Sequence, residues 1–242
     1  MNHKLHIYEN AESASRAVAE LIKDEAVLKE SESEKLNIAI SGGSTPKFLF
    51  TLLAEEYEKS IPWKSVRLFW VDERCVEPSH IESNFGMTYD ALLRKSVIPA
   101  QNIFRMKGED FPEDEAERYS KLLWKELPVR NGFPVFDIIL LGMGDDGHTA
   151  SIFPNDMTLM SADISVGVGV HPVSGQKRIT LTGKTICNAE QTVFLITGEN
   201  KAPVLKQIIK NEPSALNYPA AYIHDNKGNV DFYLDKLAAK DI

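Results

Sequence analysis

The sequence has few cysteines and no long apolar run. Its two cysteines, Cys75 and Cys187, cannot make a disulfide framework. Residues 1–10 lack the apolar core of a signal peptide, and the longest apolar run, around residues 138–141, falls far short of the ~20 residues that a membrane span requires. We therefore expect a reducing, cytoplasmic setting and no membrane role.

An excess of positive charge is also missing. The net charge is -8, from 27 Lys and Arg against 35 Asp and Glu, and this argues against a nucleic acid as the main partner. A site for a phosphate in such a chain must gather its cations locally. The motif G-x-x-x-x-G-K-[ST] of nucleoside triphosphate sites and the G-x-S-x-G elbow of serine hydrolases are absent as well, so Ser41 and Ser44 are poor candidates for an acylated serine.

What is present is a regular alternation of strand and helix patterns. This alternation predicts one domain over residues 1–242 of the three-layer α/β/α class, with a modified Rossmann-like, mostly parallel sheet and a small antiparallel portion from the late hairpin-like strands. We expect helices at 10–30, 46–57, 83–95, 112–127 and 199–210, with caps at Asn10, Thr45 and Ser83. We expect strands at 5–8, 36–40, 66–71, 103–106, 136–141, 164–170, 178–181, 192–197, 220–224 and 230–234, the last two joined by a turn at 225–228.

A glycine loop, residues 41–46, follows the strand at 36–40 and opens a helix. Backbone amides of Gly42 and Gly43, the hydroxyls of Ser44 and Thr45 and a helix N-terminus converge there, which favours an anion such as one phosphate of a small metabolite. A tight turn with a good helix cap would use the same residues. The loop has no P-loop lysine, so a nucleotide with magnesium is not expected.

Polar residues also end the strand at 66–71. Asp72 and Arg74 would lie beside the glycine loop if the two strands are neighbours, where Arg74 either contacts an anion or pairs with an acid to fix the loop. Asn84 is a candidate donor to sugar hydroxyls, whereas Ser83 is better explained as a helix cap.

The segment Asp137 to Ser151 is the strongest candidate for chemistry. Its buried apolar strand ends in glycines, two carboxylates and a histidine, and Asp146 two residues before His148 can hold the imidazole as a base. The glycines at 142, 144 and 147 match G-x-G-x-x-G, but two aspartates would meet the pyrophosphate and no helix follows, so we reject a dinucleotide site. A metal bound by Asp145, Asp146 and His148 is the rival interpretation. We rank it lower because no second histidine or cysteine stands at ligand spacing.

Two further candidate cations stand in the later part of the chain. Arg178 begins R-I-T-L-T, and Lys201 stands at the start of the helix after T-G-E-N. A lysine is poorly placed at a helix N-terminus, so an anion nearby would explain it. A surface lysine is the alternative.

Taken together, the motifs I-S-G-G-S-T-P, V-D-E-R, G-M-G-D-D-G-H-T-A-S-I-F-P, R-I-T-L-T and G-E-N-K resemble the 6-phosphogluconolactonase family over about residues 35 to 205. The resemblance implies hydrolysis of 6-phosphogluconolactone in the pentose phosphate pathway, with no cofactor. It also implies His148 as general base with Asp146 beside it, and Arg178, Lys201 and residues 42–45 as the phosphate site. Asp72 and Arg74 belong to the matching V-D-E-R element. Lys177 is a possible assistant to Arg178.

Two other functions stay open. A sugar-phosphate isomerase or deaminase of the glucosamine-6-phosphate deaminase type shares the first loop and the D-x-H element, but that branch carries a glutamate soon after the histidine. Here Ala150 to Pro154 contain no acid, which favours the lactonase. A sugar-phosphate sensor would need the phosphate site but would tolerate loss of His148.

Overall fold

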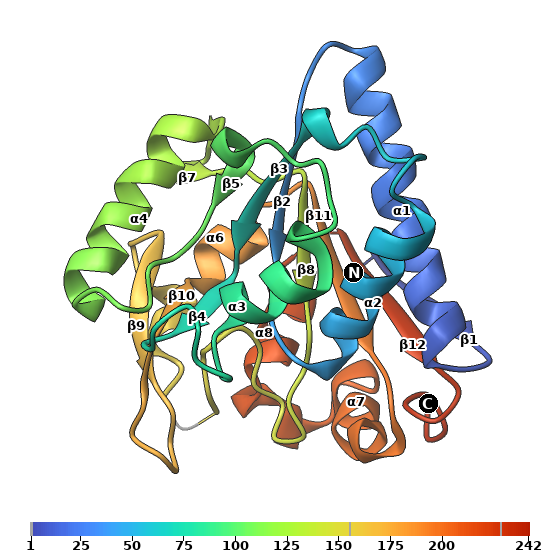
Figure 1. Cartoon of the computed structure of the whole chain (residues 1–242). Helices are drawn as coiled ribbons and strands as arrows, with labels where there is room; N and C mark the ends of the chain where they lie inside the picture. The colour runs from blue at the N-terminus through green and yellow to red at the C-terminus, as the bar shows by residue number, and fades with distance from the viewer. Residues whose placement is uncertain (1, 155, 228) are drawn as a thin grey trace.

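The chain folds around a parallel sheet with helices on both sides (Figure 1). The computed structural model describes residues 2–154, 156–227 and 229–242. Within these ranges the sheet has the order β1-β12-β11-β8-β2-β3-β5, and every neighbouring pair is parallel. Its strands are β1 (Asn2–Tyr8), β12 (Asn229–Asp235), β11 (Gln191–Ile196), β8 (Ile138–Leu141), β2 (Leu36–Ile40), β3 (Val66–Trp70) and β5 (Ile103–Phe104). The predicted fold class is confirmed.

The antiparallel portion is a second sheet, β4-β10-β9. It contains β4 (Asp72–Arg74), β10 (Lys177–Leu181) and β9 (Val166–Val170), so the strands expected at 164–170 and 178–181 are present and pair antiparallel. A further two-stranded ribbon joins β6 (Val129–Arg130) to β7 (Phe133–Pro134). Because β4 follows β3 after a single residue, the chain leaves the main sheet directly at the point where its polar strand-end residues begin.

Helices cover the sheet from both sides. They are α1 (Ala11–Ser31), α2 (Ser44–Glu56), α3 (Asn84–Thr88), α4 (Pro112–Glu126), α5 (Thr158–Ser161), α6 (Gly183–Cys187), α7 (Ala202–Ile209) and α8 (Pro219–Asn226). A turn of π-helix, Tyr89–Leu93, extends α3, and 3₁₀ turns lie at Trp63–Ser65, Ala100–Asn102, Glu199–Lys201 and Pro213–Asn217. In Figure 1, α1 and α4 lie on opposite sides of the molecule, with the strands between them.

Local signals explain where most helices begin. Asn10 caps α1 in a reciprocal capping box with Ser13, and the Ser83 hydroxyl accepts from the Gly86 amide at the start of α3. Thr45 is not the cap of α2: that helix begins at Ser44 after Gly43, whose φ of 116° only glycine adopts freely.

The expected strand at 220–224 is wrong, because these residues lie in α8. A five-residue apolar run does not distinguish a strand from a buried helix, and Pro219 at the first helical position favours the helix. The partners of β12 are instead β1 and β11, both parallel, so no terminal hairpin forms among the described residues. Residue 228, the last of the expected turn, lies outside those residues.

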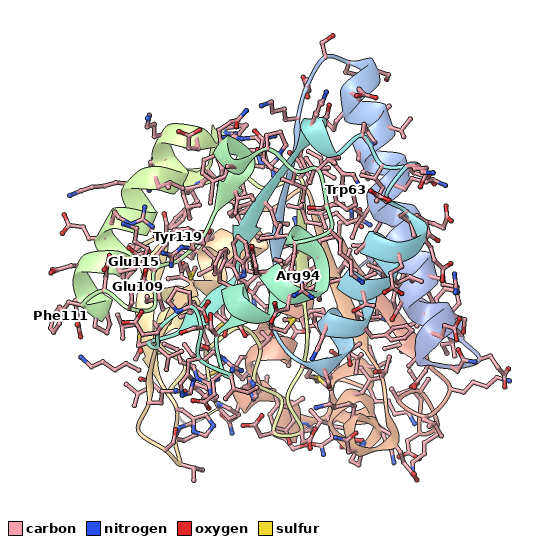
Figure 2. The ribbon with its side chains drawn as sticks, in the orientation of Figure 1. Trp63, Arg94, Glu109, Phe111, Glu115 and Tyr119 are labelled. Carbon is pink, nitrogen blue, oxygen red and sulfur yellow. The ribbon has the colours of Figure 1, made fainter. Side chains whose placement is uncertain are left out.

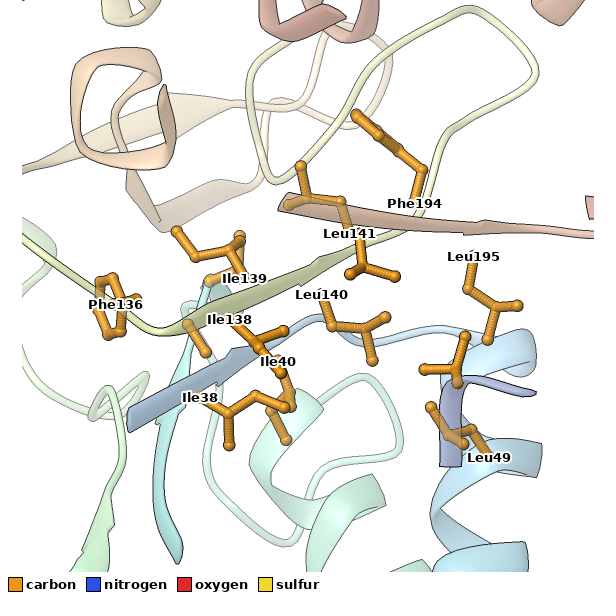
Figure 3. Close-up of a cluster of buried hydrophobic side chains, with 14 of the residues drawn as sticks. Ile38, Ile40, Leu49, Phe136, Ile138, Ile139, Leu140, Leu141, Phe194 and Leu195 are labelled. Atoms are coloured by element: carbon orange, nitrogen blue, oxygen red, sulfur yellow. The ribbon is translucent and has the colours of Figure 1, made fainter. Parts of the chain in front are cut away.

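The core lies on both faces of the central strands. Leu140 of β8 and Leu195 of β11 lie on the side of the sheet that faces Leu49 of α2, and Ile139 and Phe194 lie on the opposite side (Figure 3). At the far edge, Tyr119 of α4 is fully buried, and its hydroxyl bonds to both the amide and the carbonyl of Trp70 at the end of β3 (Figure 2). The outer helix is thereby fixed to the strand that leads into β4.

Candidate active site

The sheet order opens a crevice where β2 and β8 meet. From β2 the chain runs to β3 and β5 on one side, whereas from β8 it runs to β11 and β12 on the other. The loops after the two strands therefore diverge, and ligands of open α/β sheets bind at such switch points. A pocket of about 230 Å³ lies there. It is lined by Ser41 to Pro46, Asp72, Arg74, Asn84, Gly142, Met143, Gly144, His148, Thr149, Ala150, Arg178, Leu195, Ile196, Thr197 and Lys201.

The glycine loop forms one wall of this pocket. No side chain caps the N-terminus of α2, and among the described residues no partner is found for the backbone amides of Gly42 and Gly43. A Cβ at Gly42 would lie 1.7 Å from Oδ1 of Asn84, so only glycine allows the loop to approach that side chain. The loop thus presents free donors and a helix N-terminus to the pocket, as the anion-cradle prediction requires.

Asp146 and His148 form a hydrogen-bonded pair on the opposite wall. His148 Nδ1 lies 2.6 Å from Asp146 Oδ1, and the same oxygen accepts from the His148 amide at 3.1 Å. The hydrogen bond from the imidazole lowers the pKa of Asp146 to about 2. The carboxylate therefore stays ionised at neutral pH, and it favours the tautomer of the neutral ring with the proton on Nδ1 and a free lone pair on Nε2.

The turn after His148 is held by buried hydrogen bonds. Ala150 has a φ of 52°, in the left-handed region that costs a non-glycine residue energy. Next to it, Ser151 is fully buried, donating its hydroxyl to Asp72 Oδ2 at 2.6 Å and its amide to the Thr180 hydroxyl at 3.2 Å. Asp72, which lines the pocket, is thus also tied to the loop that carries the histidine.

Arg74 and Arg178 are direct cross-strand partners in the antiparallel sheet. Arg178 is 8% exposed, and its pKa is lowered by burial and by the charge of Arg74. Arg74 donates to the Glu82 carbonyl at 2.9 Å, while its buried Nε has no partner. Among the described residues neither guanidinium forms an ion pair with a carboxylate, contrary to the structural ion pair considered for Arg74. Like charges placed opposite each other are unfavourable unless an anion joins them.

Lys201 reaches the pocket from the 3₁₀ turn that precedes α7. The anion expected beside it is Asp145, whose Oδ1 accepts from Lys201 Nζ and, at 2.8 Å, from Asn200 Nδ2. The hydrogen bond from Lys201 lowers the pKa of Asp145. The turn itself is anchored by the buried Asp235, which accepts from the Gly198 amide at 3.1 Å.

The structure thus gathers the predicted residues at one pocket: Gly42, Gly43, Ser44, Thr45, Asp72, Arg74, His148, Arg178 and Lys201 line it, with Asp146 behind His148. Lys177 is not among the lining residues, because its ammonium pairs with Glu113 on α4 at 2.5 Å. Thr197 was missed. Its hydroxyl lies 3.0 Å from that of Thr45, and its place at the end of the buried strand 192–197 is the signal that could have identified it.

Within residues 2–154, 156–227 and 229–242 there is no group of three or more His, Cys, Asp or Glu side chains arranged to hold a metal ion. None of the helices in those ranges combines the length and apolar character that crossing a bilayer requires.

Comparison with known proteins gives consistent matches over most of the chain. The family described as Glucosamine-6-phosphate isomerases/6-phosphogluconolactonase matches residues 9–232. The chain is 43% identical to the 6-phosphogluconolactonase of Treponema pallidum over 205 residues, which are 85% of this chain and 83% of that protein. It is also 43% identical to the Haemophilus influenzae 6-phosphogluconolactonase, over 90% and 93% of the two chains. The 6-phosphogluconolactonase structure from Trypanosoma cruzi superposes with a TM-score of 0.88 at 32% identity, covering 100% of this chain and 97% of that one.

Proposed function

Because this chain belongs to the glucosamine-6-phosphate isomerase/6-phosphogluconolactonase family, we propose that it hydrolyses 6-phosphogluconolactone to 6-phosphogluconate. The observation that carries the proposal is one pocket that holds an acid-supported imidazole and two guanidiniums, neither of which has a carboxylate partner in the described part of the chain. The first supports hydrolysis of an ester, and the second supports binding of a phosphate dianion. The reaction makes the chain a carboxylic ester hydrolase, since a lactone is a cyclic ester.

His148 is the proposed general base. Nε2 takes a proton from a water molecule as that water attacks the lactone carbonyl, and Asp146 stabilises the imidazolium that forms. The proton then passes to the ring oxygen as the C–O bond of the lactone breaks. A positioned base of this kind contributes ~10² to 10⁴ in rate.

The developing oxyanion needs donors that are not already engaged. One backbone donor close to His148 is the amide of Gly144. It already donates to the His148 carbonyl at 2.9 Å, so it is not available to an oxyanion. Gly42 and Gly43 line the same pocket and their amides have no partner among the described residues, which makes them the better candidates. The groups left to bind the phosphate are the cations Arg74, Arg178 and Lys201 and the hydroxyls of Ser44 and Thr45. Asp72 also lines the pocket.

The deaminase reaction demands more of this loop. Moving a proton between adjacent carbons and opening a sugar ring needs acid-base groups besides the histidine. Residues 150–154, directly after the histidine loop, contain no carboxylate, and the buried Ser151 occupies that stretch instead. Lactone hydrolysis needs only an activated water and a stabilised oxyanion.

Turnover of freshly generated 6-phosphogluconolactone tests the proposal, with spontaneous hydrolysis subtracted. The wild type should accelerate the reaction, and His148→Ala should lower kcat by ~10² or more in a folded protein. His80→Ala is the control, because the His80 side chain is exposed and is absent from the pocket lining. Near-wild-type turnover by folded His148→Ala would remove the base assignment, and a wild type without activity would remove the function.

A further inference from the structure

The loop that carries the histidine contains a second carboxylate with a different partner. Asp146 bonds to His148, whereas its neighbour Asp145 bonds to Lys201 across the mouth of the pocket. Among the described residues, Asp145 is the only carboxylate in an ion pair with a lysine or arginine that lines the pocket. One cation of the proposed phosphate site is therefore already partly neutralised before a ligand arrives.

The geometry allows Lys201 to serve two anions at once. An ammonium has three donors, and only one of them is used by Asp145. Asn200 donates to the same carboxylate oxygen at 2.8 Å, so the carboxylate stays in place even if Lys201 turns towards a ligand. A phosphate bound by Lys201 would then lie within a few ångströms of the carboxylate of Asp145 and would be repelled by it.

We propose that Asp145 is an affinity-setting residue of the active site: as the counter-ion of Lys201, it weakens the hold on the phosphate and so keeps the product from being retained. The inference rests on the proposed function, in which Lys201 binds the phosphate. The product carries one more negative charge than the lactone, because hydrolysis creates a carboxylate. Asp145 therefore disfavours the product at least as strongly as the substrate.

The test is product inhibition in Asp145→Asn and Asp145→Ser. Each variant removes the charge at an exposed position, with a side-chain exposure of 62%, so folding should be unaffected. Repulsion between a unit charge and a dianion a few ångströms apart is worth about a factor of 10 in affinity near a solvated surface. The inhibition constant of 6-phosphogluconate should therefore fall about 10-fold, and this gain should shrink at high ionic strength.

Glu199→Gln is the matched control. Glu199 lies in the same 3₁₀ turn as Lys201 and pairs with Lys240, so the variant loses the same charge without touching the pocket cation. Its inhibition constant should stay within about 2-fold of the wild-type value. Unphosphorylated gluconate is the control ligand, and its binding should change less than that of 6-phosphogluconate.

Two results would overturn the inference in different ways. Unchanged or weaker product binding in both Asp145 variants, while Lys201→Ala still weakens 6-phosphogluconate more than gluconate, would refute the role of Asp145 and leave the phosphate site standing. Equal effects of Lys201→Ala on the two ligands would show that Lys201 does not bind the phosphate, and the inference would fall with that part of the proposed function.

Discussion

Replacing Arg178 by methionine should separate phosphate binding from folding. In the free protein Arg178 is almost buried, directly across the strand pair from Arg74, and lacks a carboxylate partner among the described residues. Methionine retains an unbranched apolar stem and removes the charge. The variant should therefore fold, and what it loses should be visible mainly when an anion is bound.

The magnitude follows from two opposing terms. Cross-strand neighbours have Cβ atoms about 5 Å apart, and two unit charges at that separation repel by about 1 to 3 kcal/mol at effective dielectric constants between 80 and 20. Removing one guanidinium relieves this repulsion, but it also loses the attraction of Arg178 to Asp72 and Glu82 and its contact with the Phe153 ring at 5.6 Å, the latter worth about 0.5 to 1 kcal/mol. We expect the free variant to be as stable as the wild type or slightly more stable.

The substitution should weaken ligand binding, although it leaves the stability of the free protein unchanged or slightly higher. A charged hydrogen bond to phosphate is worth about 1.5 to 3 kcal/mol, so the Kd of 6-phosphogluconate should rise roughly 10- to 100-fold. At a ligand concentration of 100 times the wild-type Kd, the wild type gains about 2.7 kcal/mol of stability, which raises Tm by about 5 to 11 °C for a chain of this size. The variant should gain only about 0.4 to 1.4 kcal/mol under the same conditions.

Thermal melts with and without 6-phosphogluconate measure these quantities. Arg130→Met is the matched control, because Arg130 pairs with Glu190 at 2.6 Å and is absent from the pocket lining. It should keep the full ligand-induced rise in Tm. A rise in Arg178→Met equal to that of the wild type would show that Arg178 does not bind the phosphate.

Four further outcomes follow from the structure. Asp146→Asn should lower kcat by ~10² or more, and since the hydrogen bond from His148 lowers the pKa of Asp146 to about 2, a loss of wild-type activity between pH 5 and 7 is not protonation of this carboxylate. The stabilisation that this carboxylate gives the fold is present above its unfolded pKa near 3.8 and is lost as the pH falls towards 2, which acid unfolding of wild type and Asp146→Asn would compare. Burial and the neighbouring His224 lower the pKa of His3 below 6.5, so the folded state favours the neutral ring and the free energy of unfolding should fall as the pH drops below about 6.5. Urea unfolding at pH 7.5 and 5.5 measures this fall. It should be smaller in His3→Gln than in His80→Gln, the control at an exposed position. Prolonged treatment with EDTA should leave lactone turnover unchanged, and activity that is lost and then restored by a divalent ion would make Asp145, Asp146 and His148 metal ligands. Ammonia release from glucosamine 6-phosphate should be negligible beside lactone hydrolysis, and comparable rates would move the chain to the deaminase branch.

Local sequence determined the buried strands, the polar loops that follow them and two of the helix caps. The unbroken apolar run at 138–141 and the run at 36–40, which only Asn37 interrupts, form buried strands, because a sheet covered on both faces accommodates them. The glycine loop and the D-D-G-H loop follow these strands directly, so parallel pairing of β2 with β8 brought both to one edge. The capping residues Asn10 and Ser83 were identifiable for the same reason, since a cap depends on residues at most three positions away.

Residue type alone does not predict the local structure where contacts with distant parts of the chain decide it. Residues 220–224 form a helix that begins at Pro219, whereas β12 pairs with β1 and β11, and no residue near β12 in the sequence specifies those two partners. The same limit applied to the start of α2, where the conformation of Gly43, and not the capping tendency of Thr45, set the first turn.

Only the tertiary structure decided which charges meet. The register of β4 on β10 places Arg74 opposite Arg178, although the two residues are far apart in the sequence. The 3₁₀ turn Glu199–Lys201 brings Lys201 to the carboxylate of Asp145, and the buried Ser151 ties Asp72 to the histidine loop. Such pairs depend on strand order and register, which are fixed by the burial of whole faces and not by the residues that form the pairs.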